Sequence, residues 1–130
     1  MAGYESAAEM EKVIAKWLEF IPEDDAVSEG SEGYDVSVEF EIEDLDFFFH
    51  IHFQDGSFAG GIGKFPGEVM VELCMSSEVF DGMFSGELDA TIAAMSGDLA
   101  FAGDVSAAMG LQSLQDDLNR IYLAARGESA

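Results

Sequence analysis

Positive charge is scarce in this sequence. Its 130 residues include five lysines and arginines against 27 aspartates and glutamates, which gives a formal net charge of −22. The five cations are too few and too scattered to build a basic surface for phosphate groups; they are Lys12, Lys16, Lys64, Arg120 and Arg126. Nucleic acid is therefore excluded as an expected partner, and so is stable docking on an anionic membrane.

Cysteine and long apolar runs are also scarce or absent. Cys74 is the only cysteine, so no intramolecular disulfide can form and a reducing compartment is expected. Cys74 itself fits a half-buried strand residue better than a catalytic thiol. The N-terminus carries no basic flank before an apolar stretch, and no apolar run approaches the length of a membrane span. The sequence thus predicts a cytoplasmic protein.

Large apolar side chains are abundant by contrast. Hydrophobic residues make up 48% of the chain, with 11 phenylalanines and seven methionines. A highly charged chain with few apolar residues would be disordered, whereas this one can bury a normal core beneath an acidic surface. The length fits a single domain over residues 1–130. The aperiodic stretch 22–33 is expected to be an acidic loop.

The first third of the chain predicts a helix followed by two paired strands. A capping box at Ser6 and Glu9 begins a helix over residues 6–21, which Pro22 ends. Strict alternation of apolar and polar residues then predicts strands over 34–42 and 45–53. A turn at Glu43-Asp44 pairs them in a register with both apolar rows on one face. The inward pairs expected are Ile42–Leu45, Phe40–Phe47 and Val38–Phe49.

A second hairpin follows. Asp55-Gly56 is a favoured two-residue turn, and it leads into a glycine-rich third strand from Ser57. The inward pairs expected here are Phe53–Phe58 and Phe49–Ile62. Lys64 is the next inward position at the end of this strand, and Val69–Met75 is a fourth strand.

The pattern then changes to short helices. Ser76 or Ser77 is expected to cap a helix that ends at Gly86, and Asp89 to cap another that ends at Gly97, with Ile92 and Met95 on its apolar side. Residues 98–102 are predicted to form a short strand with Leu99 and Phe101 inward. Asp104 caps a last helical region with a break near Gly110. Early strands and late helices favour an α+β domain, a largely antiparallel sheet covered on one face by helices.

His50 and His52 lie two residues apart on one strand face, which is a spacing found in metal sites. The predicted register places His50 opposite Ser37 and His52 opposite Asp35, so a histidine bonded to a cross-strand carboxylate is the simpler interpretation. No further ligands are identifiable, and no metal is expected. The sequence Gly-x-Ser-x-Gly is absent, and with 27 acidic residues any carboxylate pairing is uninformative.

The run from Ser85 to Asp104 resembles the signature region of the sterol carrier protein type 2 (SCP2) family. It has Ser85-Gly86, then a short helix, then Gly97-Asp98-Leu99-Ala100-Phe101-Ala102-Gly103-Asp104. The strands at 34–40 and 47–53 and the Asp55-Gly56 turn resemble the opening meander of that family, so the resemblance extends over about residues 5–125. It implies an SCP2-like α+β fold with a five-stranded mixed sheet, helices over one face and an apolar tunnel for a lipid. It also implies no catalysis and no cofactor.

Three functions remain open, of which the least supported is an enzyme that uses His50 and His52 with a metal. The first is a non-enzymatic carrier that binds a long apolar lipid (a fatty acid, a sterol-like molecule or an isoprenoid) between the inner sheet face and the later helices. Lys64 would pair with a ligand carboxylate. The second is the same fold with a filled core, acting as a homodimer or as a scaffold for an enzyme. The ligand-binding residues expected for the carrier are Phe49, Phe58, Ile62, Phe80, Met83, Phe84, Met95, Phe101, Met109 and Leu114.

The acidity itself has two explanations. One is adaptation to concentrated salt, which screens like charges such as the predicted cross-strand pair Glu41–Asp46. The other is an ordinary acidic protein whose core holds it together at any ionic strength. The sequence favours neither.

Overall fold

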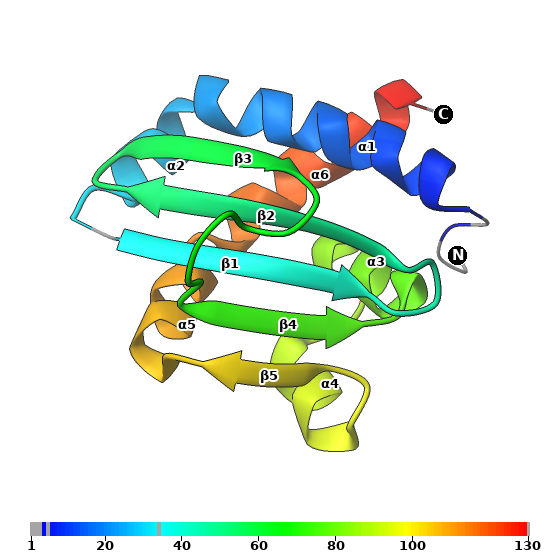
Figure 1. The fold of residues 1–130 in the computed structure, drawn as a ribbon. Coiled ribbons are helices and arrows are strands. Elements are labelled where there is room, and N and C mark those ends of the chain that lie inside the picture. Colours follow the sequence, from blue (N-terminus) through cyan, green and yellow to red (C-terminus); the bar gives the residue numbers. More distant parts are fainter. Residues whose placement is uncertain (1–3, 5, 34, 130) are drawn as a thin grey trace.

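The computed structural model describes residue 4, residues 6–33 and residues 35–129. A five-stranded sheet forms one layer and the helices form a second layer on one of its faces (Figure 1). This is the α+β architecture that the sequence predicts. Residues 1–3 and 5, part of the N-terminus inspected for a signal, and Tyr34, the predicted start of the first strand, lie outside the described residues.

The sheet is mixed, with the strand order β3-β2-β1-β4-β5. Its strands β1 and β4 pair in parallel, and every other neighbouring pair is antiparallel. The parallel pair requires a crossover, and Figure 1 shows that the segment between β3 and β4 passes over the sheet face opposite the helices. The strands are β1 (Asp35–Ile42), β2 (Phe47–Gln54), β3 (Ser57–Ile62), β4 (Val71–Met75) and β5 (Ala100–Gly103).

The register of β1 on β2 differs from the prediction by two residues. Phe40 faces Phe49, not Phe47, because residues 43–46 form the turn. Two side chains hold this longer turn in place: Ser77 donates to Asp44 from both its amide and its hydroxyl, each at 2.7 Å. A shift of two preserves the face of every side chain, so the inward row is as predicted.

The second hairpin is confirmed in register. Phe53 faces Phe58 and Phe49 faces Ile62. Asp55 and Gly56 both have positive φ, 46° and 84°, which is the conformation that a two-residue hairpin turn favours. The Asp55 carboxylate also accepts a hydrogen bond from the Gly33 amide at 2.9 Å, which fixes the preceding loop to the turn.

The helices begin where the sequence predicts caps. Ser6, Ser76, Asp89 and Asp104 each accept a hydrogen bond from a first-turn amide. The predicted break near Gly110 lies slightly later, between Gln112 and Gln115. The helical elements are α1 (Ala7–Phe20), η1 (Ile21–Glu23), α2 (Asp25–Gly30), α3 (Ser77–Ser85), α4 (Ala90–Ser96), α5 (Val105–Gln112) and α6 (Gln115–Ser129).

The segment 22–33, predicted as a loop, contains the short helix α2. Its N-cap is Asp24, whose side chain accepts from the Val27 amide at 3.1 Å. Val27 is buried against the core. A single apolar anchor in an acidic segment is too short a pattern to reveal a helix from periodicity.

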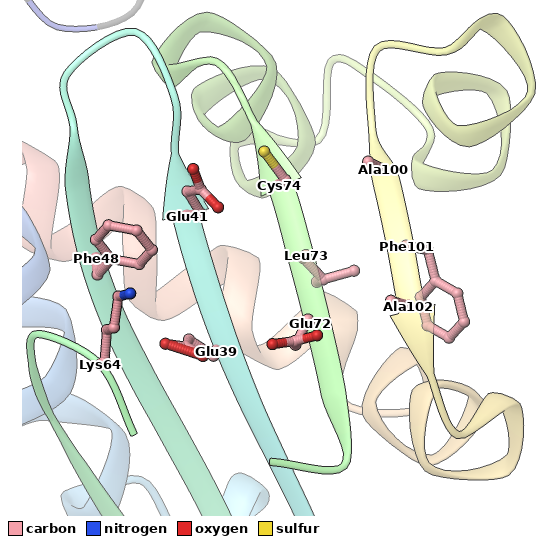
Figure 2. Close-up of a pocket in the computed structure, with 10 residues that line it drawn as sticks. All are labelled: Glu39, Glu41, Phe48, Lys64, Glu72, Leu73, Cys74, Ala100, Phe101 and Ala102. Carbon is pink, nitrogen blue, oxygen red and sulfur yellow. The ribbon is translucent and has the colours of Figure 1, made fainter. Parts of the chain in front are cut away.

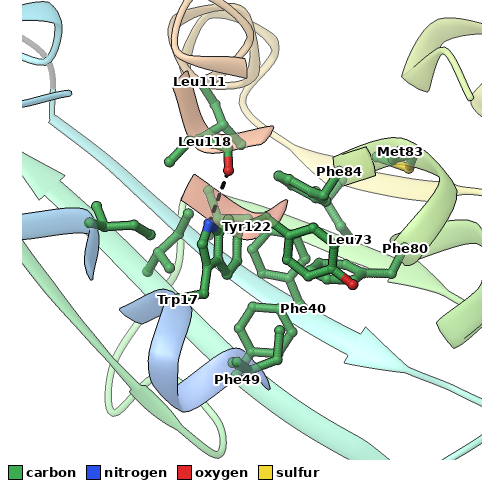
Figure 3. Close-up of a cluster of buried hydrophobic side chains, with 14 of the residues drawn as sticks. Trp17, Phe40, Phe49, Leu73, Phe80, Met83, Phe84, Leu111, Leu118 and Tyr122 are labelled. Carbon is green, nitrogen blue, oxygen red and sulfur yellow. Dashed lines mark hydrogen bonds between the residues drawn. The ribbon is translucent and has the colours of Figure 1, made fainter. Parts of the chain in front are cut away.

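An aromatic cluster fills the centre between the sheet and the helices (Figure 3). Trp17 is fully buried there, and its ring contacts Phe84 edge-on with centroids 5.0 Å apart. Its indole N–H donates to the Leu118 carbonyl at 3.1 Å, so α1 is tied to α6. Phe40 and Phe49 stack at 4.5 Å on the sheet side. Among the described residues, these aromatic side chains therefore occupy the middle of the fold.

Helix α4 lies beyond the β5 edge and buries little. The prediction that Ile92 and Met95 form its apolar side is wrong: their exposed fractions are 60% and 83%, and Ala93 is the buried residue. Within the described ranges, no helix combines the length and apolar composition needed to cross a bilayer.

Candidate ligand-binding groove

An apolar groove opens between the β4–β5 end of the sheet and helices α3, α4 and α5. Its volume is about 360 Å³, which falls in the range of small-molecule sites, about 300–1,000 Å³. We call it the apolar groove. It is lined by Val71, Leu73, Met83, Phe84, Ala90, Thr91, Ala94, Leu99, Phe101, Val105, Ala108, Met109, Leu111, Gln112 and Gln115.

The floor of the apolar groove is buried and its mouth is exposed. Val71 and Leu111 are buried at the floor. At the mouth, Phe101, Val105 and Met109 expose 40%, 64% and 65% of their surface. Exposed apolar side chains that cluster at a concave surface indicate a binding site, whereas single exposed apolar side chains are common on any protein. No lining residue carries an ionisable side chain.

The structure brings together four of the ten predicted ligand-binding residues. Met83, Phe84, Phe101 and Met109 line the apolar groove. Phe49, Phe80 and Leu114 are instead buried in the core. Phe58 and Ile62 belong to β3 at the opposite edge of the sheet, and Met95 is exposed on α4.

Sequence reasoning missed several lining residues. Val71 and Leu99 were predicted only as inward strand residues, and Val105 only as part of a helix. A signal was available, since Leu99 lies in the signature run just before β5 and Val105 directly follows that run. What the sequence could not show is that the aromatic cluster occupies the centre, while the apolar groove lies at the β4–β5 end.

A second, more polar hollow adjoins the apolar groove and shares Ala90 with it. Its volume is about 410 Å³, and we call it the polar extension. Gln115 donates to the Asn119 side-chain oxygen at 2.7 Å on its wall. The lining residues are Met83, Gly86, Leu88, Asp89, Ala90, Gln112, Gln115, Asp116 and Asn119.

Lys64 lies on the opposite face of the sheet from the one predicted. It lines an outer hollow of about 480 Å³. Figure 2 shows it there with Glu39, Glu41 and Glu72. Its ammonium nitrogen is 4.7 Å from the centre of the Phe48 ring. The reason is local: β3 ends at Ile62, and Gly63 at φ 101° turns the chain outward. Lys64 therefore does not face the apolar groove as a carboxylate partner.

The two histidines have ordinary partners on this outer face. His52 Nε2 donates to Asp35 at 2.9 Å, as predicted, although the residue directly opposite is Ser37. His50 faces Glu39, not Ser37, and its Nδ1 donates to the Gly63 carbonyl at 3.0 Å. Among the residues that the structure describes, no three histidine, cysteine or acidic side chains are placed to hold a metal ion.

Cys74 is a half-buried residue of β4, as predicted. Its sulfur donates to Glu43 at 3.5 Å. Burial, followed by this hydrogen bond and the nearby glutamate charges, raises the pKa of the thiol. A raised pKa lowers the thiolate fraction, so the site is unsuited to nucleophilic chemistry.

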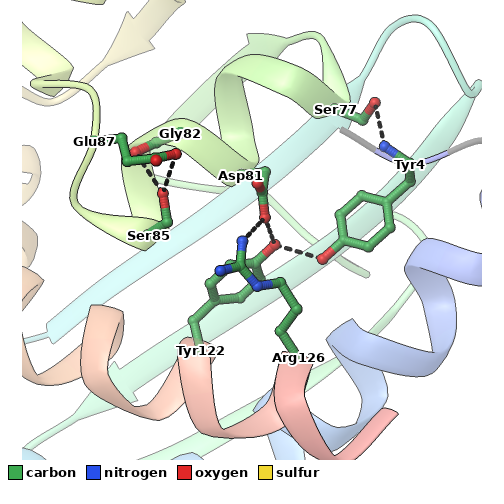
Figure 4. A network of polar contacts seen from close by, with 8 residues as sticks. All are labelled: Tyr4, Ser77, Asp81, Gly82, Ser85, Glu87, Tyr122 and Arg126. Carbon is green, nitrogen blue, oxygen red and sulfur yellow. Dashed lines mark hydrogen bonds and ion pairs between the residues drawn. The ribbon is translucent and has the colours of Figure 1, made fainter. Parts of the chain in front are cut away.

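A buried polar network joins α3 to α6 (Figure 4). Asp81 accepts from the Tyr122 hydroxyl at 2.6 Å and from Arg126 at 2.7 Å. The Tyr4 and Tyr122 hydroxyls share a hydrogen bond at 2.5 Å. Burial is the main reason that the pKa of Tyr4 is raised to about 12. The network stands apart from the apolar groove and holds elements together.

The sequence also matches a known protein family. A profile of the SCP-2 sterol transfer family matches residues 8–116. The chain belongs to the SCP-2 sterol transfer family. No curated protein is significantly similar to it in sequence.

Solved structures share the SCP-2 fold at low sequence identity. A conserved hypothetical protein from Thermus thermophilus superposes with a TM-score of 0.71 at 14% identity, covering 99% of this chain and 94% of that one. A UbiJ-SCP2 ubiquinone synthesis protein gives 0.63 at 15%, covering 86% and 94%. A stereoselective inverting sec-alkylsulfatase from Pseudomonas sp. gives 0.58 at 16%, covering 72% of this chain. The chain spans only 14% of that enzyme's length, whereas it spans 94% of the other two chains, so this fold occurs both as nearly a whole chain and as a small part of an enzyme.

Proposed function

We propose that this SCP-2 domain is a non-catalytic carrier that binds one long apolar molecule in the apolar groove. The observation that carries the proposal is the groove itself: an apolar concavity whose mouth exposes Phe101, Val105 and Met109. A chain of fatty, sterol-like or isoprenoid character would cover these side chains. The lack of ionisable lining residues supports binding without chemistry.

The magnitudes fit reversible binding. Each methylene removed from water contributes about 0.8 kcal/mol, so roughly ten of them contribute about 8 kcal/mol. Association costs about 4–15 kcal/mol in lost freedom. At the lower cost the balance is about 4 kcal/mol, which corresponds to weak, reversible binding with a Kd of about 1 mM, and at the higher cost no net affinity remains from these methylenes alone.

Filling the apolar groove should abolish binding without disturbing the core. Ala94 lines the groove yet is exposed on α4, so in Ala94→Trp the indole enters the groove and does not overpack buried side chains. We expect uptake of the uncharged dye Nile red to fall at least about tenfold, more than 1.4 kcal/mol. Fluorescence titration measures it.

The matched control is Ala15→Trp, an exposed alanine of α1 away from the groove. It should bind the dye like the parent. Mass spectrometry of lipids that co-purify with the parent identifies the natural ligand class. A parent that neither takes up Nile red nor retains any lipid would contradict the carrier proposal.

A scaffold or dimerisation role is the alternative, and the exposure of Ile92 and Met95 on α4 favours it. If these side chains mediate self-association, sedimentation should show a dimer that Met95→Glu dissociates. The carrier needs no such dimer. We propose the cytoplasm as the compartment, because a single cysteine suits a reducing environment.

A further inference from the structure

We propose that the polar extension receives the head group of the ligand, and that this head is uncharged and hydrogen-bonding, such as an alcohol or an amide, not a carboxylate or a phosphate. The inference rests on the proposed carrier function and specifies the ligand class for the same site.

The two hollows adjoin each other, because four residues line both. These residues are Met83, Ala90, Gln112 and Gln115. The lining changes from one hollow to the other, from aliphatic and aromatic side chains to amides and carboxylates. An amphipathic ligand lying across both would place its chain between the sheet and the helices, and its head beside Gln115 and Asn119.

The amides suit a neutral head. Gln112, Gln115 and Asn119 each carry both a donor and an acceptor. The hydrogen bond from Gln115 to Asn119, at 2.7 Å, uses one donor of the first and the oxygen of the second. The Gln115 oxygen and the Asn119 NH₂ group are then an acceptor and a donor on the same wall. A hydroxyl, which donates and accepts, matches this pair.

An anionic head finds no partner here. The lining includes Asp89 and Asp116 but no lysine, arginine or histidine. The amides that begin α4 are already used, because Asp89 accepts from the Thr91 and Ile92 amides at 2.8 and 3.3 Å. A carboxylate or phosphate would therefore meet two like charges and a net charge of −22.

A cationic head is the competing match, because the lining holds two carboxylates. The Asp89 carboxylate is engaged by backbone amides, and Asp116 lies in the first turn of α6, where the helix dipole favours its negative charge. Asp116 is exposed and can pair with an amine, so hexadecylamine is the competitor that the test below includes. The amides remain the uncharged groups with unused hydrogen-bonding capacity.

Three ligands with one chain and different heads test the proposal. Hexadecanol, palmitate and hexadecylamine are each used to displace Nile red from the parent protein at about 0.15 M KCl, where the Debye length is about 8 Å. We expect hexadecanol to displace the dye at a concentration at least about tenfold lower than palmitate.

Two variants that each remove one carboxylate test whether the polar extension causes the preference for hexadecanol over palmitate. Asp89→Asn keeps a good helix cap, and Asp116→Asn keeps the shape of the side chain. Each should improve palmitate displacement by about threefold to tenfold and leave hexadecanol unchanged. The control Asp25→Asn removes one charge from the first turn of α2, away from both hollows, and should change neither.

The outcomes separate the two proposals. The head-group inference would be overturned if palmitate bound as tightly as hexadecanol. It would also be overturned if neither Asp89→Asn nor Asp116→Asn reduced the preference for hexadecanol over palmitate. In both cases, binding of Nile red by the parent would still support the carrier function. Tightest binding of hexadecylamine would overturn the head-group inference in favour of a cationic head. Failure of the parent to bind Nile red or any of the three ligands would overturn the carrier function and the inference together.

Discussion

Tyr4 and Tyr122 show how burial of single residues couples this fold to alkaline pH. The folded protein holds the pKa of Tyr4 at about 12, chiefly because burial disfavours the phenolate, against an ordinary value of 10.0. Burial and the hydrogen bond to Asp81 likewise raise the pKa of Tyr122. Both phenols are therefore protonated in the folded state at a pH where unfolded tyrosine ionises.

Tyr4→Phe should make stability less sensitive to alkali. Because the pKa of Tyr4 is higher in the folded protein, the unfolded chain releases this proton first as the pH rises. The free energy of unfolding therefore keeps the full contribution of Tyr4 below about pH 10 and loses it as the pH rises through about 12. At neutral pH the free energy of unfolding of the variant should be lower by about 0.5–1.5 kcal/mol, because the hydrogen bond between the Tyr4 and Tyr122 hydroxyls is gone. Its melting temperature should then fall less steeply than that of the parent from about pH 9 to about pH 11. Parallel curves for the two proteins would show that Tyr4 does not carry the effect.

Elements are held in this fold by close backbone approaches as well as by packing. Gly103 ends β5 at φ 120°, and a methyl group on its Cα would overlap the Met70 carbonyl oxygen. That carbonyl accepts a hydrogen bond from the Asp104 amide at 2.8 Å. The link fixes the start of α5, and thus one wall of the apolar groove, against β4.

Gly103→Ala should destabilise the protein by about 3 kcal/mol or more, since backbone strain and overlap add. Gly97→Ala is the matched control: its φ is 87°, but nothing lies within 4 Å of the added methyl group. It should cost only about 1 kcal/mol, the strain alone. Chemical denaturation measures both. Equal losses would mean that the approach to Met70 has no energetic weight.

Charge acts on the whole molecule. Within the described residues the arginines pair with Asp24, Asp117 and Asp81, which leaves most carboxylates without a cation. The predicted clash of Glu41 with Asp46 is wrong, because Glu41 faces Phe48. The parallel register instead sets Glu39 beside Glu72 on the outer face, and like charges opposite one another are destabilising.

Salt should therefore raise the melting temperature. The Debye length falls from about 30 Å at 0.01 M to about 3 Å at 1 M, so repulsion among surface carboxylates is largely screened. We expect the melting temperature to rise steadily between about 10 mM and about 2 M KCl. The rise should be smaller in Glu72→Gln, because Glu39 then has one repulsive neighbour fewer. A flat or falling melting temperature would refute adaptation to salt and leave the acidity as an aid to solubility.

Local patterns determined most of the elements and their type, with the short helix α2 as the exception. Alternation predicted the strands, and caps such as Ser6 and Asp104 predicted where helices begin, because these signals depend only on near neighbours. The signature run near β5 indicated the family, which the profile match over residues 8–116 confirms. The net charge of −22 is likewise fixed by composition alone.

Tertiary contacts decided the site. Ser77 donates hydrogen bonds to Asp44 and thereby holds the four-residue turn that goes with the observed β1–β2 register. Gly63, with its positive φ, turns the chain so that Lys64 lies on the outer face. The aromatic cluster around Trp17 closes the centre of the fold and leaves the apolar groove at the β4–β5 end. Hence only four of the ten predicted ligand-binding residues line it. Periodicity tells which side of an element is apolar, but only the packing of distant elements decides which apolar side chains fill space and which border it.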